Sequence, residues 1–185
     1  MTERLHPSPP AALSVRRREL YDAIAGGPRA LGPQHFALTR DDGSLRGPFD
    51  AFLLVPELGG ALQEVGAAIR YRGALSDRSR EIAILLVAAR WDSAFEREAH
   101  EAVGAAAGLT DAELAALRDG EFAAFSGEEA LVAAVTAQLL DGDLDDRAWE
   151  AASATLGAEI VFELTVLVGY YATLALQLRV FRVQP

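Results

Sequence analysis

The sequence of 185 residues contains no cysteine, and all 17 of its basic residues are arginine, so it also lacks lysine. Without cysteine the chain has no disulfide, no thiolate nucleophile, no peroxidatic thiol and no cysteine ligand for a metal. Without lysine it has neither a P-loop lysine nor a Schiff-base amine, which excludes a lysine-anchored pyridoxal cofactor. Any catalysis by this chain is therefore expected to use other side chains.

Histidine is scarce as well, with only His6, His35 and His100 in the chain. A catalytic zinc site of three histidines would need all three to converge from distant parts of the sequence. We therefore expect no metal site and no cofactor.

The composition is that of a soluble globular protein, with 51% hydrophobic and 24% charged residues. The net charge of -10 argues against a nucleic-acid partner and against acidic membranes. The N-terminal residues are polar and proline-rich, without the apolar run of a signal peptide. The long apolar segment 158–180 is interrupted by Glu159, Glu163 and Arg179, which predicts a buried helix and no membrane span. We expect a cytoplasmic protein.

Alanine dominates the sequence and no segment alternates with period two, so the pattern predicts an all-α fold. We expect an extended arm over residues 1–13, where prolines block a helix, and a single domain over 14–185 with about eight helices. A loop is expected over 29–47. The helices are expected near 15–25, 48–55, 56–71, 77–91, 93–108, 111–120, 126–140, 146–156 and 158–180.

Three ionisable residues, Glu81, Glu96 and His100, stand among alanine, leucine, valine and phenylalanine. Residues four apart lie on one face of a helix, so Glu96 and His100 are expected to be neighbours. Glu81 begins the most apolar helix, whose centre 82–89 is expected to be buried on every side. Carboxyl and imidazole groups in a poorly hydrated cleft exchange protons near neutral pH, which general acid–base catalysis requires.

Each of these residues also has a structural interpretation. Ser93 and Glu96 have the spacing of a capping box, so Glu96 could serve only a helix N-terminus. Glu81 could pair with Arg80 or Arg90, and His100 could be a hydrogen-bonded histidine at an interface. The sequence leaves these alternatives open.

Several segments together carry a resemblance to a known family. They are residues 80–90, Phe95-Glu96 with His100, Gly108-Leu109, residues 45–49 and Gly169-Tyr170-Tyr171. In these residues the chain resembles the carboxymuconolactone decarboxylase family, which belongs to the superfamily of the alkylhydroperoxidase AhpD. The resemblance implies an AhpD-like helical bundle and a homo-oligomer, whether dimer, trimer or hexamer, with the Glu/His pocket near subunit contacts.

In the AhpD-like peroxidases a Cys-x-x-Cys pair precedes the histidine, and the matching positions here are Ser93 and Glu96. A serine hydroxyl cannot reduce a peroxide through a disulfide cycle, so thiol peroxidase activity is not expected. The glutamate and histidine are retained at Glu81 and His100, as in the cysteine-free, decarboxylase-like branch.

The resemblance implies a cofactor-free lyase, a decarboxylase acting on a small carboxylated lactone or oxo-acid. We expect His100 to donate or shuttle the proton, Glu96 to orient it, and Glu81 to complete the relay. An arginine would bind the substrate carboxylate, and Arg46, Arg72, Arg80 and Arg90 are the candidates. The residues expected to line the pocket are Phe49, Trp91, Ser93, Phe95 and Tyr170. The alternatives are an isomerase, a lactone hydrolase and a non-catalytic oligomer that binds small molecules.

Overall fold

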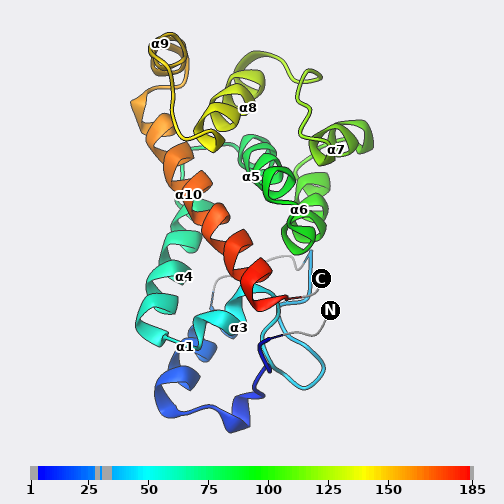
Figure 1. The fold of residues 1–185 in the computed structure, drawn as a ribbon, viewed down its shortest axis with the longest axis vertical. Coiled ribbons are helices and arrows are strands. Elements are labelled where there is room, and N and C mark those ends of the chain that lie inside the picture. The colour runs from blue at the N-terminus through cyan, green and yellow to red at the C-terminus, as the bar shows by residue number, and fades with distance from the viewer. Residues whose placement is uncertain (1–3, 28–29, 31–34, 184–185) are drawn as a thin grey trace. The chain divides into compact units, whose positions relative to one another are not determined.

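The computed structural model describes residues 4–27, 30 and 35–183. Over these residues the chain is all-helical, as predicted, with nine α-helices, one 3-10 turn and a single isolated bridge between Thr39 and Leu45 (Figure 1). Outside the described residues lie the first residues of the expected arm, residues 28–29 and residues 31–34. The start of the expected loop is therefore largely outside them as well. The helices are α1 (Val15–Ala25), α3 (Pro48–Phe52), α4 (Pro56–Tyr71), α5 (Asp77–Trp91), α6 (Ala94–Ala106), α7 (Asp111–Arg118), α8 (Gly127–Leu140), α9 (Asp146–Thr155) and α10 (Ala158–Phe181).

The chain forms two compact units by its internal contacts, Met1–Arg72 with Leu176–Pro185 and Gly73–Ala175. In the first unit, α1 and α3 pack on α4. A 3-10 turn over Pro10–Ala12 replaces part of the expected extended arm, because a proline at the first helical position loses no hydrogen bond. The division into an arm at 1–13 and a domain at 14–185 stays a prediction.

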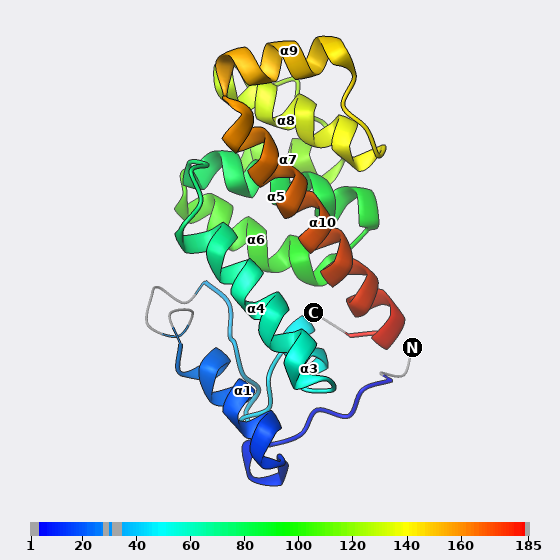
Figure 2. The ribbon, with the colours of Figure 1, turned by 90° about the vertical axis from the view of Figure 1, so that its left-hand side faces the viewer.

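The second unit is built around α5, against which α6, α7 and α8 pack, while α9 packs on α8 (Figure 2). The Ser76 side chain caps α5 by accepting a hydrogen bond from the Ser79 amide. Every residue of α5 from Ser79 to Ala88 is buried. The expectation of a centre buried on all sides is confirmed over residues 82–88, while Ala89 is half-buried.

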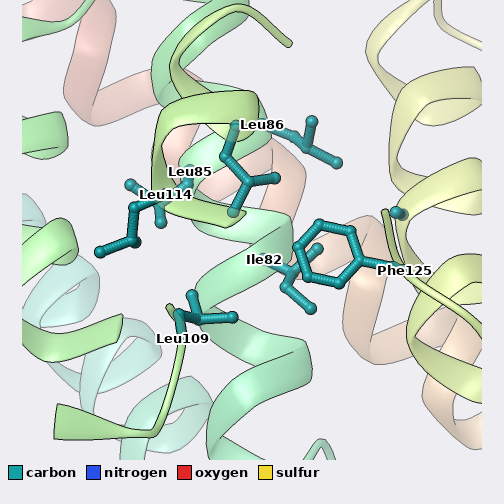
Figure 3. Close-up of a cluster of buried hydrophobic side chains, with 8 residues drawn as sticks. Ile82, Leu85, Leu86, Leu109, Leu114 and Phe125 are labelled. Carbon is teal, nitrogen blue, oxygen red and sulfur yellow. The ribbon is translucent and has the colours of Figure 1, made fainter. Parts of the chain in front are cut away.

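One face of α5 forms the apolar core of this unit (Figure 3). Ile82, Leu85 and Leu86 project from it toward the segment that leads into α7, α7 itself and the segment before α8. Their buried neighbours are Leu109, Leu114, Leu117, Phe125 and Ala133. Because successive helical residues are about 100° apart, this packing leaves Glu81 on a different side of α5 from Ile82.

Arg78 ties three further segments to the first turn of α5. Its guanidinium donates to Glu129 of α8 at 2.7 Å, to Glu113 of α7 at 2.9 Å, and to the Gly108 carbonyl. Glu113 also closes the capping box with Thr110 that begins α7. These contacts fix the end of α5 that carries Glu81.

Among the described residues, α10 is the one helix long and apolar enough to cross a bilayer by length and composition, with 44% of its most apolar window buried. A core helix of a soluble protein meets the same criterion, so this finding is weak evidence. That α10 does not span a membrane stays a prediction.

Candidate functional site

The site is built on a contact between α5 and α6 in the second unit. The Nδ1 atom of His100 lies 2.6 Å from Oε2 of Glu81, which is a short hydrogen bond between two side chains distant in sequence. Glu81 is 0% exposed and His100 is 7% exposed. The pair is therefore held in a poorly hydrated part of the protein, where a polar contact is strengthened by the low local dielectric.

A glycine beside this contact leaves room for the side chain of Leu109. Gly104 follows His100 by four residues, on the same face of α6. A Cβ atom at Gly104 would lie 2.8 Å from the Leu109 side chain and 3.7 Å from the Cβ of Glu81. A larger residue would therefore push Leu109 away, while its Cβ would make only an ordinary contact with Glu81.

The imidazole also contacts α10. The Tyr171 ring meets the His100 ring edge-on, with centroids 5.1 Å apart and planes at 86°, and Tyr170 meets Tyr171 in the same way at 5.2 Å. The His100 ring is thus held at Nδ1 by Glu81 and on another side by Tyr171. No hydrogen bond to its Nε2 atom is found in the part of the chain that the structure describes.

Arg80 brings a positive charge to the same place. It is 8% exposed, and its Nε atom lies 3.7 Å from Oε1 of Glu81 while another nitrogen bonds to Asp77. Within the described residues, neither Nε nor Oε1 has a hydrogen-bond partner. The ion pair with Arg80 and the contact with His100 therefore exist together, while Arg90 is exposed and pairs with Asp141 at 3.5 Å.

Glu96 is a buried carboxyl on the first turn of α6, and only 3% of it is exposed. Neither of its oxygens forms a hydrogen bond in the described structure. Burial raises the pKa of Glu96 to about 8. The nearby Ser93 hydroxyl lowers this pKa only in part, and it lies outside the geometry of a hydrogen bond. Glu96 is consequently a neutral carboxylic acid at pH 7, with a proton that it can donate.

This arrangement corrects two interpretations of Glu96. The Ser93 side chain does not cap α6 and Glu96 makes no bond back to it, so the capping-box interpretation is wrong. Glu96 was expected to orient His100, but no hydrogen bond joins the two side chains over the described residues, and Nδ1 of His100 is bonded to Glu81 instead. The spacing of four residues places the two side chains on one face but does not bond them.

The remaining residues predicted for the site are divided between the two units. Ser93, Phe95 and Tyr170 are buried in the unit that holds the Glu81–His100 pair, and Trp91 is half-buried at the end of α5. Phe49 belongs to the other unit, where its ring packs edge-on against Phe52 at 5.8 Å. Arg46 and Arg72 also belong to that unit. That these residues line a substrate pocket stays a prediction.

Residues 56–138 match the carboxymuconolactone decarboxylase family. Over this segment, the chain is similar to that family. The matched segment contains α5, α6 and all three of Glu81, Glu96 and His100, so it includes the buried pair. No curated protein matches the chain.

Two features of the structure were not found from the sequence. The contact of Tyr171 with His100 comes from α10, outside the matched segment, and no local pattern links residues so far apart. A cavity of about 400 Å³ also opens on the Leu86 side of α5, between α7 and α8. It is lined by Leu86, Ala89, Arg90, Arg118, Asp119, Gly120, Ala137, Leu140 and Asp141, and thus by none of the three candidate catalytic residues.

Proposed function

We propose that this protein is a member of the carboxymuconolactone decarboxylase family and a cofactor-free acid–base enzyme, a lyase that decarboxylates a small carboxylated lactone or oxo-acid. The observation that carries the proposal is the buried 2.6 Å contact of Glu81 with His100, one helical turn from the buried Glu96, whose pKa burial raises to about 8. A base and an acid in one dry location are what proton transfer to and from carbon requires.

His100 is the proton shuttle in this proposal, and Glu81 is its positioning residue. We assign the Nδ1–H of His100 as the donor to Glu81, which leaves the lone pair on Nε2 to accept a proton from substrate. Tyr171 restricts rotation of the ring. A fixed tautomer and a fixed ring orientation lower the entropic cost of reaching the transition state.

Decarboxylation breaks the bond between the carboxyl carbon and its neighbour. CO2 leaves, and the electron pair is delocalised into the adjacent carbonyl as an enolate. Nε2 of His100 accepts the proton of the substrate carboxyl as this bond breaks and passes it to solvent. Glu96 supplies the proton that forms the new C–H bond, and solvent returns a proton to Glu96. Arg80 is the cation nearest the pair within this unit, and its free Nε–H suits an enolate or carboxylate oxygen.

Isomerisation uses the same two groups without loss of CO2, with Nε2 of His100 taking a proton from carbon and Glu96 returning one. One set of assays therefore separates the two reactions. Small carboxylated lactones and oxo-acids are incubated with the protein in D2O, and CO2 release and deuterium incorporation next to the carbonyl are followed. CO2 release with one deuterium in the product is expected. Deuterium incorporation without CO2 release would favour an isomerase.

The variant His100→Ala is expected to lower turnover by about 10²–10⁴-fold, the usual contribution of a positioned acid–base group. His100→Gln, which keeps a polar group beside Glu81, is the second variant should His100→Ala unfold. Glu98→Gln on the exposed side of α6 is the matched control and should keep full activity. Unchanged turnover in folded His100→Ala, or no turnover of any compound by the native protein, would contradict the proposal.

A further inference from the structure

The cavity of about 400 Å³ lies where three helices of the second unit end. Its lining residues come from the last two turns of α5, the end of α7 and the end of α8. Leu86 belongs to the apolar core of this unit and Leu140 packs against that core, so the floor of the cavity continues it. The volume falls within the roughly 300–1,000 Å³ that small-molecule sites occupy.

The cavity stays open because the chain turns away at the ends of α7 and α8. Gly120 follows α7 with a φ of 75°, and Gly142 follows α8 with a φ of 98°. A glycine in this left-handed conformation ends a helix and redirects the chain. A Cβ atom built on Gly120, which lines the cavity, would meet no other atom within 4 Å. No described segment therefore covers this part of the rim.

The charges around the cavity favour a positive ligand. Arg118 is neutralised by Glu101, which accepts two hydrogen bonds from it at 2.6 and 2.7 Å. Asp119 accepts no hydrogen bond from the described residues, and Asp141 has only the 3.5 Å contact with Arg90. Each helix C-terminus adds about half a negative charge. No basic residue lies in the last turn of α8 to offset its share.

We infer that this cavity binds a small organic cation, an ammonium group carried on a compact apolar body. The apolar body occupies the floor formed by Leu86, Ala137 and Leu140, where it is removed from water. The ammonium group lies at the rim between Asp119 and Asp141. Arg90 is 61% exposed on its side chain, so it can turn to solvent when the cation takes its place beside Asp141.

An anion is a poorer occupant of the same cavity. Of the two arginines that line it, only Arg90 has no short hydrogen bond to a carboxylate, and the helix C-termini repel a negative group. The net charge of -10 raises the local concentration of cations and lowers that of anions. The carboxylated substrate proposed above is therefore not the ligand. This site is independent of the acid–base chemistry, since neither Glu81 nor His100 lines it.

Three probes of nearly equal size separate the contribution of charge from that of apolar burial. Benzylammonium, benzyl alcohol and benzoate are titrated into the full chain, and amide shifts are followed by NMR. Benzylammonium should shift the amides of residues 118–120 and 137–141 with a dissociation constant on the order of 1 mM, as expected for so small a ligand. Benzyl alcohol should bind about threefold more weakly, and benzoate about tenfold more weakly.

Substitutions of charged residues give changes of opposite sign. Asp119→Asn combined with Asp141→Asn should weaken benzylammonium about tenfold and leave benzyl alcohol unchanged. Arg90→Met should tighten benzylammonium about threefold, because it removes the competing cation. Asp146→Asn, the same chemical change at an exposed residue of α9 outside the cavity, is the matched control and should bind as the native chain does. Ala137→Leu should weaken all three probes by filling the floor.

Several results would overturn the proposal. Benzoate that binds more tightly than benzylammonium, with a loss in Arg90→Met, would make this an anion site. Equal affinity for benzyl alcohol and benzylammonium would show that charge has no part in binding. The absence of saturable shifts at these amides, or shifts confined to residues around His100, would remove the site altogether. His100→Ala should bind benzylammonium as the native chain does, so failure of the proposed reaction leaves this test unaffected.

Discussion

Glu96 holds a proton at neutral pH because water cannot reach it, and this has a cost to the folded state. In the unfolded chain the same carboxyl is solvated and ionises near its ordinary pKa of 4.5. Above that pH the folded chain retains a proton that the unfolded chain has lost. A buried acid of this kind lowers stability as pH rises, and proteins keep such groups mainly where function needs them.

Stability should therefore fall with rising pH through Glu96. The raised pKa of Glu96, about 8, places the loss between about pH 4.5 and pH 8, with a slope near 1.4 kcal/mol per unit for full titration. In Glu96→Gln the amide does not titrate, so this loss is absent. Urea unfolding at pH 5 and pH 8 measures the difference. At the higher pH the free energy of unfolding of the variant should gain on the order of a few kcal/mol relative to that of the native chain.

Ser93→Ala is the control for that measurement, because it keeps the titrating carboxyl and removes only the hydroxyl that offsets its pKa. Its stability should fall with pH as steeply as that of the native chain. Equal pH dependence in the native chain and in Glu96→Gln would show that Glu96 is ionised in the fold, and the proton donor would have to be another group.

At the scale of elements, much of the fold could be predicted from local signals. Ser76 before α5, the Thr110–Glu113 box before α7 and the glycines and prolines between helices set the helix bounds, because caps and breakers act within a few residues. Ser93 and Glu96 show the limit of this reasoning. They have the spacing of a capping box, yet packing against α5 buries Glu96 and leaves the cap unmade.

The contacts of the site could not be predicted in the same way. The sequence placed Glu81, Glu96 and His100 in one region, but it could not show which carboxylate bonds the imidazole. That choice depends on how α6 packs on α5, and on Tyr171 from α10. Both are properties of tertiary packing, which local periodicity does not encode.

The packing of Leu109 against Gly104 makes Gly104→Ala a specific test. The new methyl group would lie 2.8 Å from Leu109 and 3.4 Å from Leu114, so we expect a loss of about 1–3 kcal/mol in the free energy of unfolding. Gly60→Ala on α4 is the matched control, since its Cβ meets only Leu20 at 4.0 Å. It should be neutral or gain up to about 1 kcal/mol from helix propensity. Chemical denaturation of both variants measures these changes in the free energy of unfolding. A gain in stability of Gly104→Ala would contradict the expectation.

Arg78 should matter more for stability than an exposed arginine with equally short bonds. Arg78→Met leaves two carboxylates, Glu113 and Glu129, without their shared cation, and we expect a loss of about 1–3 kcal/mol. Arg118→Met removes a two-bond pair with Glu101 in which the arginine side chain is 50% exposed, and it should cost less. Thermal denaturation of both variants in low and high salt gives the comparison. An equal effect of the two substitutions would show that Arg78 is only a surface ion pair.

At the scale of the whole molecule, the amino-acid composition excludes some classes of reaction but assigns none. The absence of cysteine leaves the chain without a peroxidatic thiol, and this needs no structure to establish.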